Sequence, residues 1–553
     1  MRQPQPPPGA RLPHRAGAVC DPRRVDGVGA ATAWLRRSDP LPAALVVTAI
    51  VVWGARGLHA PLARDPALYL YAGQQVAAGE PPYVAVLNRS GPFSHLLPAL
   101  GVELGRFFGA GDVMGAKLLY LALTVSAPAL VYLLGRTVFG SRLAGVTAAA
   151  ALLSIQVLAV TATGGPEAKL PMMTALLVAL LLLVRRRWLW AGVATAVATL
   201  TWQPVLVTLA PAAALLVLTV PGGLRARARA AAWYAGGGLA TLGATVAGFW
   251  LMGAFDAFVE GYWTVNASHT RQTGAFVRPG RVLDALYEGL GWTLVTVLVG
   301  CLVSLALGIA AIRVRRTAPR RASNLVALAL ATVGTLTWCG IAFNHAPDGL
   351  TLYPLAALGL GGGCGVLAHR VRGARRVRAR RLLAGAVAGW FAICAVLTFD
   401  HTMSRHSTEL VDQRALAEGV MRHLPEDATV FSFEATQPLV LTRSTSISRV
   451  VLFDHGMRDY VATQWAGGLN GYVAWLITEQ PDVVFMSTKN PGAFVGPLLE
   501  SYVKVSGPAR LGGHQEWRTF VRADLDPATV RAIREDVWAA RRARAGHDAD
   551  GSS

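Results

Sequence analysis

The chain of 553 residues carries 52 Lys and Arg against 32 Asp and Glu, which gives a formal net charge of +20. Hydrophobic residues make up 53% of the chain and charged residues only 15%, whereas a typical soluble chain has about 25% charged residues. This composition, with a mean hydropathy of +0.41, excludes an ordinary soluble protein and a disordered, collagen-like or disulfide-framework chain. It indicates a polytopic membrane protein.

The N-terminal segment precedes the apolar part of the chain. Residues 1–40 are rich in Pro and Arg and cannot form a hydrophobic core, so we interpret them as a disordered cytoplasmic tail. The first apolar run begins near Leu41, which is too late for an ordinary signal peptide. We therefore expect this run to stay in the protein as its first transmembrane helix.

Apolar runs between residues 41 and 400 predict a polytopic α-helical membrane protein with about eleven transmembrane helices. No internal repeat of clear period is visible among them, which disfavours an inverted-repeat transporter. The expected spans are 41–58, 113–134, 142–162, 167–184, 188–201, 204–220, 231–252, 289–312, 325–343, 350–368 and 381–399.

Arginine clusters predict the orientation of these spans. Residues 185–187 precede the two shortest runs and Arg225, Arg227 and Arg229 follow them. Two short helices that cross and return place both clusters in the cytoplasm, whereas one long helix would place them on opposite sides. The clusters at 313–321 and 370–381 fall on the same inner side, so the basic charge fits the positive-inside rule and not a nucleic-acid partner.

The same orientation predicts three extracytoplasmic segments. They are the loops 59–112 and 253–288 and a soluble α/β domain at 401–553. In that domain we expect helices at 409–423 and 458–478, strands at 429–434 and 482–487, a strand pair near 502–522 and an Arg-rich helix at 526–545.

The first loop holds the most informative polar residues. Asp65 and Pro66 are typical of a helix start, with Asp65 as the N-cap residue. Hydrogen bonds to the charged carboxylate would lower its pKa and keep Asp65 ionised. Arg89 follows in the same loop within Asn-Arg-Ser-Gly-Pro. A carboxylate and a cation at one membrane surface suit transfer from a lipid phosphate, although Asp65 as a helix cap and nothing more is the plainer interpretation.

The pattern D-x-x-x-Y at residues 65–69, then G-E-P-P-Y at 79–83, then Arg89 and Pro92, resembles the first extracytoplasmic loop of GT-C glycosyltransferases. The branch it is most similar to contains the protein O-mannosyltransferases and the lipid A aminoarabinose transferases. The resemblance covers the architecture of residues 41–400, but specific residues only between about 60 and 100.

The resemblance implies an inverting, polyprenyl-phosphate-dependent membrane glycosyltransferase with the lipid-linked sugar as donor and an extracytoplasmic acceptor. It assigns the general base to Asp65 and the contact with the donor phosphate to Arg89, where relatives often have Lys. Many relatives carry a second acidic residue directly after the Asp, where this chain has Pro66. A divalent cation as cofactor is therefore left open.

Other polar residues are candidates for contact with substrate, each with a plain structural alternative as a helix start, an interfacial side chain or a solvated loop charge. They are Tyr83 and Asn88 in the first loop, Glu167 and Lys169 at an outer helix start, His269 and Arg271 in loop 253–288, and His345 and Tyr353 at a turn between spans.

Two other classes of protein compete with the enzyme. A transporter or lipid flippase predicts ionisable residues inside several spans, whereas in this chain they occur mostly near span ends. A non-catalytic membrane scaffold predicts that the loop residues can be replaced without effect. Neither the sugar nor the acceptor follows from the sequence.

Overall fold

The computed structural model describes residues 39–550 except 270–278, 315–317, 371–374, 455, 489–492 and 507–516. The chain divides into Met1–Leu41 and Pro42–Ser553. The second unit contains the elements described below, and Leu41 is the first residue of α2. Of the predicted tail, residues 1–38 lie outside the described part of the chain.

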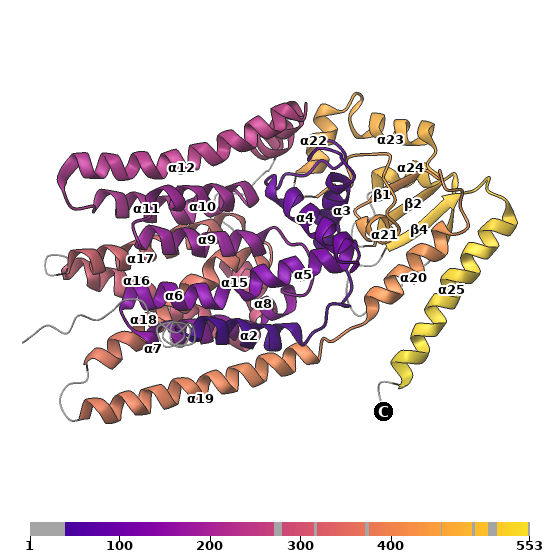
Figure 1. Ribbon diagram of the computed structural model, residues 1–553. Helices are drawn as coiled ribbons and strands as arrows, with labels where there is room; N and C mark the ends of the chain where they lie inside the picture. Colours follow the sequence, from indigo (N-terminus) through magenta and orange to yellow (C-terminus); the bar gives the residue numbers. More distant parts are fainter. Residues whose placement is uncertain are drawn as a thin grey trace, which may run out of the picture. The chain divides into compact units, whose positions relative to one another are not determined.

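The described helices between Leu41 and Met403 form a helical bundle (Figure 1). Among the described residues, five segments are long and apolar enough to cross a membrane: Asp112–Phe139, Pro279–Arg313, Pro319–Ala342, Ala346–Arg370 and Val377–Met403. The predicted count of about eleven spans is thus reached only in part, because five other apolar helices are shorter than the 18 residues required for a span. The elements are α2 (Leu41–Gly54), α5 (Asp112–Val125), α6 (Ala127–Phe139), α7 (Arg142–Leu153), α8 (Gln156–Thr161), α9 (Lys169–Val184), α10 (Trp188–Thr201), α11 (Val205–Leu218), α12 (Gly223–Leu251), α15 (Pro279–Leu290), η2 (Gly291–Thr293), α16 (Leu294–Arg313), α17 (Pro319–Ala342), η3 (Ala346–Thr351), α18 (Leu352–Arg370) and α19 (Arg375–Met403).

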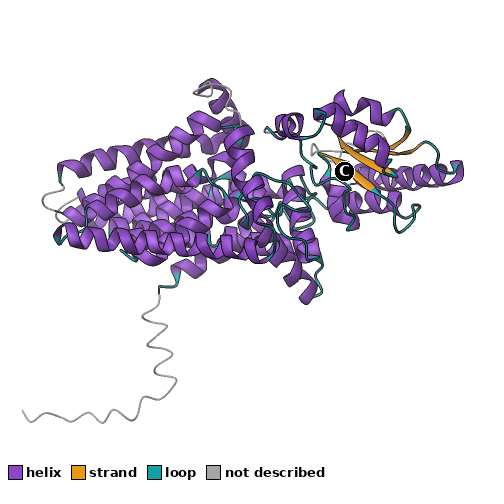
Figure 2. Cartoon of the chain, turned by 90° about the horizontal axis from the view of Figure 1, so that it is seen from above, coloured by secondary structure: helices purple, strands orange, loops and turns teal. Residues whose placement is uncertain are grey.

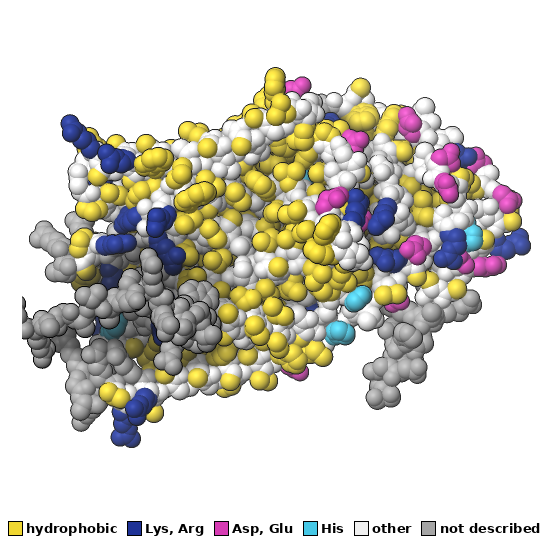
Figure 3. Space-filling view, viewed as in Figure 1, with side chains coloured by type: hydrophobic (Ala, Val, Ile, Leu, Met, Phe, Trp, Pro, Cys, Tyr) yellow, Lys and Arg dark blue, Asp and Glu magenta, His cyan; other side chains and the backbone are white. Residues whose placement is uncertain are grey.

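The short helices α10 and α11 run in opposite directions, as the charge pattern predicts. Arg186, just before α10, donates hydrogen bonds to the carbonyl oxygen of Leu216 near the end of α11 and, at 3.1 Å, to the hydroxyl of Ser323 near the start of α17. Lys and Arg side chains gather at this end of the bundle, with apolar side chains along the helices beyond it (Figure 3). We call this end of the bundle, around Arg186, the basic end.

The C-terminal region contains the strands of the structure (Figure 2). They form a four-stranded sheet in the order β1-β2-β4-β3, in which the pair β1 and β2 is parallel and the other two pairs are antiparallel. Side chains alternate along β2, as the two-residue period of a strand requires. Val483 and Phe485 pack with α20 and α25, whereas Val484 and Met486 pack with α22 and α23. The elements are α20 (Glu409–Met421), β1 (Val430–Phe433), α21 (Thr436–Thr442), α22 (Met457–Gln464), α23 (Gly468–Glu479), β2 (Val483–Ser487), η4 (Ala493–Val495), α24 (Gly496–Leu499), β3 (Tyr502–Ser506), β4 (Trp517–Arg522) and α25 (Pro527–Asp550).

The prediction of one helix over residues 458–478 is wrong. Gly467 and Gly468 both adopt positive φ angles, of 75° and 64°. A right-handed helix excludes such angles, so the chain turns there and forms α22 and α23 as separate helices.

The first loop and the C-terminal region share one hydrophobic core. Leu68 and Tyr71 of α3 (Arg64–Ala77) are buried in the same cluster as Leu439 of α21 and Val483 of β2. The loop also contains α4 (Phe93–Phe107), which packs against α3. The second loop contains α13 (Phe255–Phe258), the π-helix η1 (Val259–Thr264) and α14 (Val265–His269).

Candidate functional site

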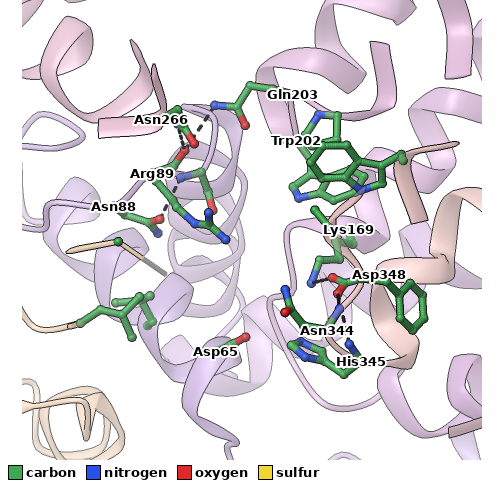
Figure 4. Close-up of a pocket in the computed structure, with 18 of the residues that line it drawn as sticks. Asp65, Asn88, Arg89, Lys169, Trp202, Gln203, Asn266, Asn344, His345 and Asp348 are labelled. Atoms are coloured by element: carbon green, nitrogen blue, oxygen red, sulfur yellow. Dashed lines mark hydrogen bonds and ion pairs between the residues drawn. The ribbon is translucent and has the colours of Figure 1, made fainter. Parts of the chain in front are cut away.

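A cavity of about 790 Å³ lies at the end of α10 that is opposite the basic end. The first loop supplies Asp65 and Arg89 to its wall, the bundle supplies Lys169 and His345, and the C-terminal region supplies Asp459. Figure 4 shows the first four of these side chains around one space. The structure therefore brings together residues that are far apart in the sequence, including the two to which the first-loop pattern assigns the chemistry.

Asp65 lies in the first turn of α3 and is not its N-cap residue. The N-cap is Ala63, and no side chain caps the helix. The carboxylate is instead paired with Arg64, whose Nε lies 3.1 Å from Oδ1, and its side chain is 35% exposed. Burial alone would raise the pKa of Asp65, but the positive charges of Arg64 and Lys169 outweigh burial and hold that pKa below its usual range. The predicted ionisation of Asp65 is supported, but an ion pair causes it rather than a helix cap.

The turn that carries Arg89 is held from both sides. Its carbonyl oxygen accepts hydrogen bonds from Nδ2 of Asn266 at 2.7 Å and from Nε2 of Gln203 at 3.3 Å. Oδ1 of Asn88 accepts the backbone N–H of Ser90 at 2.9 Å. With the backbone fixed in this way, the Arg89 side chain points into the cavity (Figure 4).

Tyr83 supports this turn and does not line the cavity. It is fully buried, and its hydroxyl donates a hydrogen bond to the carbonyl oxygen of Ser90 at 2.7 Å. Its ring packs against His95, with centroids 4.6 Å apart. Burial lowers the pKa of His95 to about 3, so this imidazole stays neutral and packs as an aromatic ring.

Replacing Gly91 by Ala is expected to displace the Arg89 turn. An added Cβ would lie 1.9 Å from the carbonyl oxygen of Leu200 in α10, and overpacking of this kind costs roughly 1–3 kcal/mol. We expect a lower thermal unfolding midpoint for Gly91→Ala. The control is Gly54→Ala, where a Cβ meets nothing within 4 Å. Equal unfolding midpoints for the two variants would show that the turn tolerates the added methyl group.

Lys169 lies across the cavity from Asp65 and is held by two acidic side chains. Its Nζ lies 3.0 Å from Oδ1 of Asp348 and 3.6 Å from Oε1 of Glu167. The backbone N–H groups of Asn344 and His345 donate to Oδ2 of Asp348 at 2.8 and 3.2 Å. Lys169 is thus charged and fixed in position at the cavity wall.

Two further predicted residues, Glu167 and Tyr353, lie behind the cavity wall. Glu167 is buried next to Lys169 and does not line the cavity. Tyr353 is also buried, and its hydroxyl donates to the carbonyl oxygen of Ala346 at 2.5 Å. Both side chains therefore support the wall.

The remaining two predicted residues belong to loop 253–288. His269 is the last residue of α14, and its side chain, like the whole of Arg271, lies outside the part of the chain that the structure describes. Within the described part, no group of three His, Cys, Asp or Glu side chains could hold a metal ion.

Several cavity residues were not identified from the sequence. Trp202, Gln203 and Pro204 join α10 to α11, and all three line the cavity. Arg64, Asn266 and Asp348 stand next to predicted residues or in segments already singled out. Arg281 likewise lies in the predicted loop 253–288, whereas Trp338 and Asp459 carry no local signal in the sequence that separates them from other residues of their type.

No protein-family model and no curated protein sequence matches this chain. Solved structures do match it. The crystal structure of ArnT from Cupriavidus metallidurans bound to undecaprenyl phosphate has a TM-score of 0.57 at 15% identity, covering 88% of this chain and 98% of ArnT. The apo crystal structure of the same ArnT gives 0.56 at 15% identity, with 89% and 98% covered. The cryo-EM structure of the arabinofuranosyltransferase AftD from Mycobacteria gives 0.48 at 16% identity, with 88% and 40% covered.

The chain therefore shares its fold with the ArnT crystal structures over 88–89% of its length. The fold implied by the resemblance of the loop that contains Asp65 and Arg89 is confirmed by this likeness to ArnT.

Proposed function

We propose that this protein is an integral membrane glycosyltransferase that moves a sugar from a polyprenyl-phosphate donor to an extracytoplasmic acceptor in the cell envelope. The observation that carries the proposal is one cavity in which the carboxylate of Asp65 faces the cations Arg89 and Lys169. The fold adds support, because the ArnT that it resembles binds undecaprenyl phosphate.

The proposed reaction is an inverting displacement at the anomeric carbon. Asp65 takes the proton of the acceptor hydroxyl, and the oxygen of that hydroxyl forms the new bond to the anomeric carbon. The bond between that carbon and the phosphate oxygen breaks, and its electron pair leaves with the polyprenyl phosphate. A positioned base contributes about 10²- to 10⁴-fold to such a rate, and cations at the leaving phosphate stabilise its developing charge.

In the same proposal the basic end of the bundle is cytoplasmic and the cavity opens on the outer side of the membrane. The arginine clusters support this orientation through the positive-inside rule. Cysteine-scanning with a membrane-impermeant thiol reagent would test it. Labelling of a cysteine placed at Gly280, beside the cavity residue Arg281, is expected in intact cells.

The activity is tested with the purified full-length protein and a panel of radiolabelled polyprenyl-phosphate sugars, together with a cell-envelope extract as acceptor. We expect the label of one donor to pass to the extract while polyprenyl phosphate is released. Movement of an unchanged donor lipid across a vesicle membrane, without cleavage, would instead identify a flippase. Donor lipids that are neither cleaved nor moved would leave the scaffold as the better explanation.

A further inference from the structure

Arg64 joins the candidate base to the C-terminal region through three carboxylates. Its Nε lies 3.1 Å from Oδ1 of Asp65, one terminal nitrogen lies 3.4 Å from Oε2 of Glu434, and the other lies 2.6 Å from Oδ2 of Asp454. The Arg64 side chain is only 15% exposed. Each of its three nitrogens therefore has a separate partner, which fixes the plane of the guanidinium group.

The C-terminal region holds its end of this junction firmly. Glu434 follows β1 directly, and its side chain is fully buried. Its Oε1 accepts the backbone N–H of Phe453 at 3.1 Å, and its own N–H donates to the carbonyl oxygen of Val451 at 2.8 Å. Its φ of 55° is unusual for a residue other than glycine, and such strain is typical of functional sites.

The cavity is reached by only one of the three carboxylates. Arg64 and Asp65 line it, whereas Glu434 and Asp454 lie behind Arg64. Within the described part of the chain, the hydrogen bonds of Asp65 involve Oδ1 only. Arg64 therefore orients the carboxylate and leaves Oδ2 for an acceptor hydroxyl.

We propose that Arg64 is a positioning residue, which sets the orientation and charge of Asp65 and is itself held in place by Glu434 and Asp454 of the C-terminal region. This inference rests on the proposed function, because it assigns a task to a residue that acts through the base. It also gives the C-terminal region a part in the reaction, although Glu434 and Asp454, unlike Asp459, do not line the cavity.

The pH dependence of transfer separates this role from a purely structural one. Arg64 is a cation next to Asp65, so Arg64→Gln removes a charge that lowers the pKa of the carboxyl group. An opposite charge at this distance shifts a pKa by about 1–3 units, so the fall of kcat/KM on the acid side should move to higher pH by that amount. Arg64→Gln leaves the other charged and titratable groups near Asp65 unchanged. Lys169, His345, Tyr69 and the buried Glu167 interact with it electrostatically, and Arg89, Arg281, Asp348 and Asp459 line the same cavity.

The experiment compares kcat and KM against pH for Arg64→Gln, Arg64→Lys and Asp454→Asn in the full-length protein. Arg64→Lys keeps the positive charge but cannot contact all three carboxylates as the guanidinium group does. We therefore expect kcat to fall, while the pH at which kcat/KM falls on the acid side stays the same. Asp454→Asn removes one anchor of Arg64, and we expect a kcat roughly 3- to 30-fold lower with an unchanged donor KM. The matched control is Arg106→Gln. Like Arg64, Arg106 pairs with more than one carboxylate, in this case Asp112 and Glu103 of the first loop, but it does not line the cavity.

The inference is overturned if Arg64→Gln has the pH profile and the kcat of the wild type. If Arg64→Gln does not fold, an unchanged kcat in Asp454→Asn overturns it. The same series includes Asp65→Asn. If Asp65→Asn is inactive while Arg64→Gln behaves as wild type, only the role of Arg64 is wrong. If Asp65→Asn is fully active, the assignment of the base itself fails.

Discussion

Replacing Asp65 by Asn is expected to lower the rate of sugar transfer by about 10²- to 10⁴-fold, because the acceptor hydroxyl loses the group that takes its proton. The two side chains have nearly the same size, and Arg64 keeps its bonds to Glu434 and Asp454. We therefore expect normal folding and nearly normal binding of the donor lipid. The measurement is transfer of label from a polyprenyl-phosphate sugar under single-turnover conditions.

The pH dependence of the wild-type protein belongs to the same prediction. The folded-state pKa of Asp65 is depressed, so the base stays ionised at neutral pH and is lost only as the pH falls through that depressed value, below the ordinary Asp pKa of about 3.9. Any fall in activity between pH 5 and 7 would have to come from another group. Asp256→Asn changes an exposed Asp of the second loop that does not line the cavity and serves as the control. Equal rates for Asp256→Asn and Asp65→Asn would remove Asp65 from the mechanism.

Reversing the charge of Arg89 should chiefly weaken the use of the donor. Hydrogen bonds to charged groups contribute roughly 1.5–3 kcal/mol, which corresponds to about a 10- to 150-fold rise in the donor KM for Arg89→Glu. Arg89→Lys keeps the charge but loses the planar group, so a smaller rise is expected. Donor KM is measured at a saturating acceptor concentration.

The control for Arg89 is Arg534→Glu, which reverses an exposed charge on α25 outside the cavity. The backbone of the Arg89 turn is held by Asn266 and Gln203 through its carbonyl oxygen, so both side-chain changes should leave the turn in place. An unchanged donor KM in Arg89→Glu would refute contact with the phosphate.

Local patterns were sufficient to predict most of the helical part. The pairing of short apolar runs with arginine clusters predicts that α10 and α11 reverse direction, and the bond from Arg186 to Leu216 confirms it. Asp65 and Arg89 both follow the first span in the same loop, which predicts that they share one site. Both line one cavity. These inferences depend on charge and hydropathy, which act over one or two helices.

Interactions between distant segments could not be predicted in this way. Arg64 and Glu434 are separated by 370 positions, and nothing in the sequence around either residue specifies the other. The N-cap assignment failed for a different, local reason. Asp65 fits the local rule for a cap, but the helix begins one residue before it, at Arg64, and the carboxylate pairs with this neighbouring side chain. The sequence predicts that Tyr83 contacts substrate. In the structure its hydroxyl instead donates a hydrogen bond to the backbone carbonyl oxygen of Ser90.

The shared core of the first loop and the C-terminal region has a consequence for biosynthesis. The ribosome makes α3 long before it makes α21 and β2, which cover the apolar face that includes Leu68 and Tyr71. At about 5–20 residues per second, the intervening stretch of more than 300 residues takes roughly 15–70 s to translate. During that time this face is without its final covering, so a nascent or prematurely terminated chain is a natural client for chaperones and proteases of the membrane.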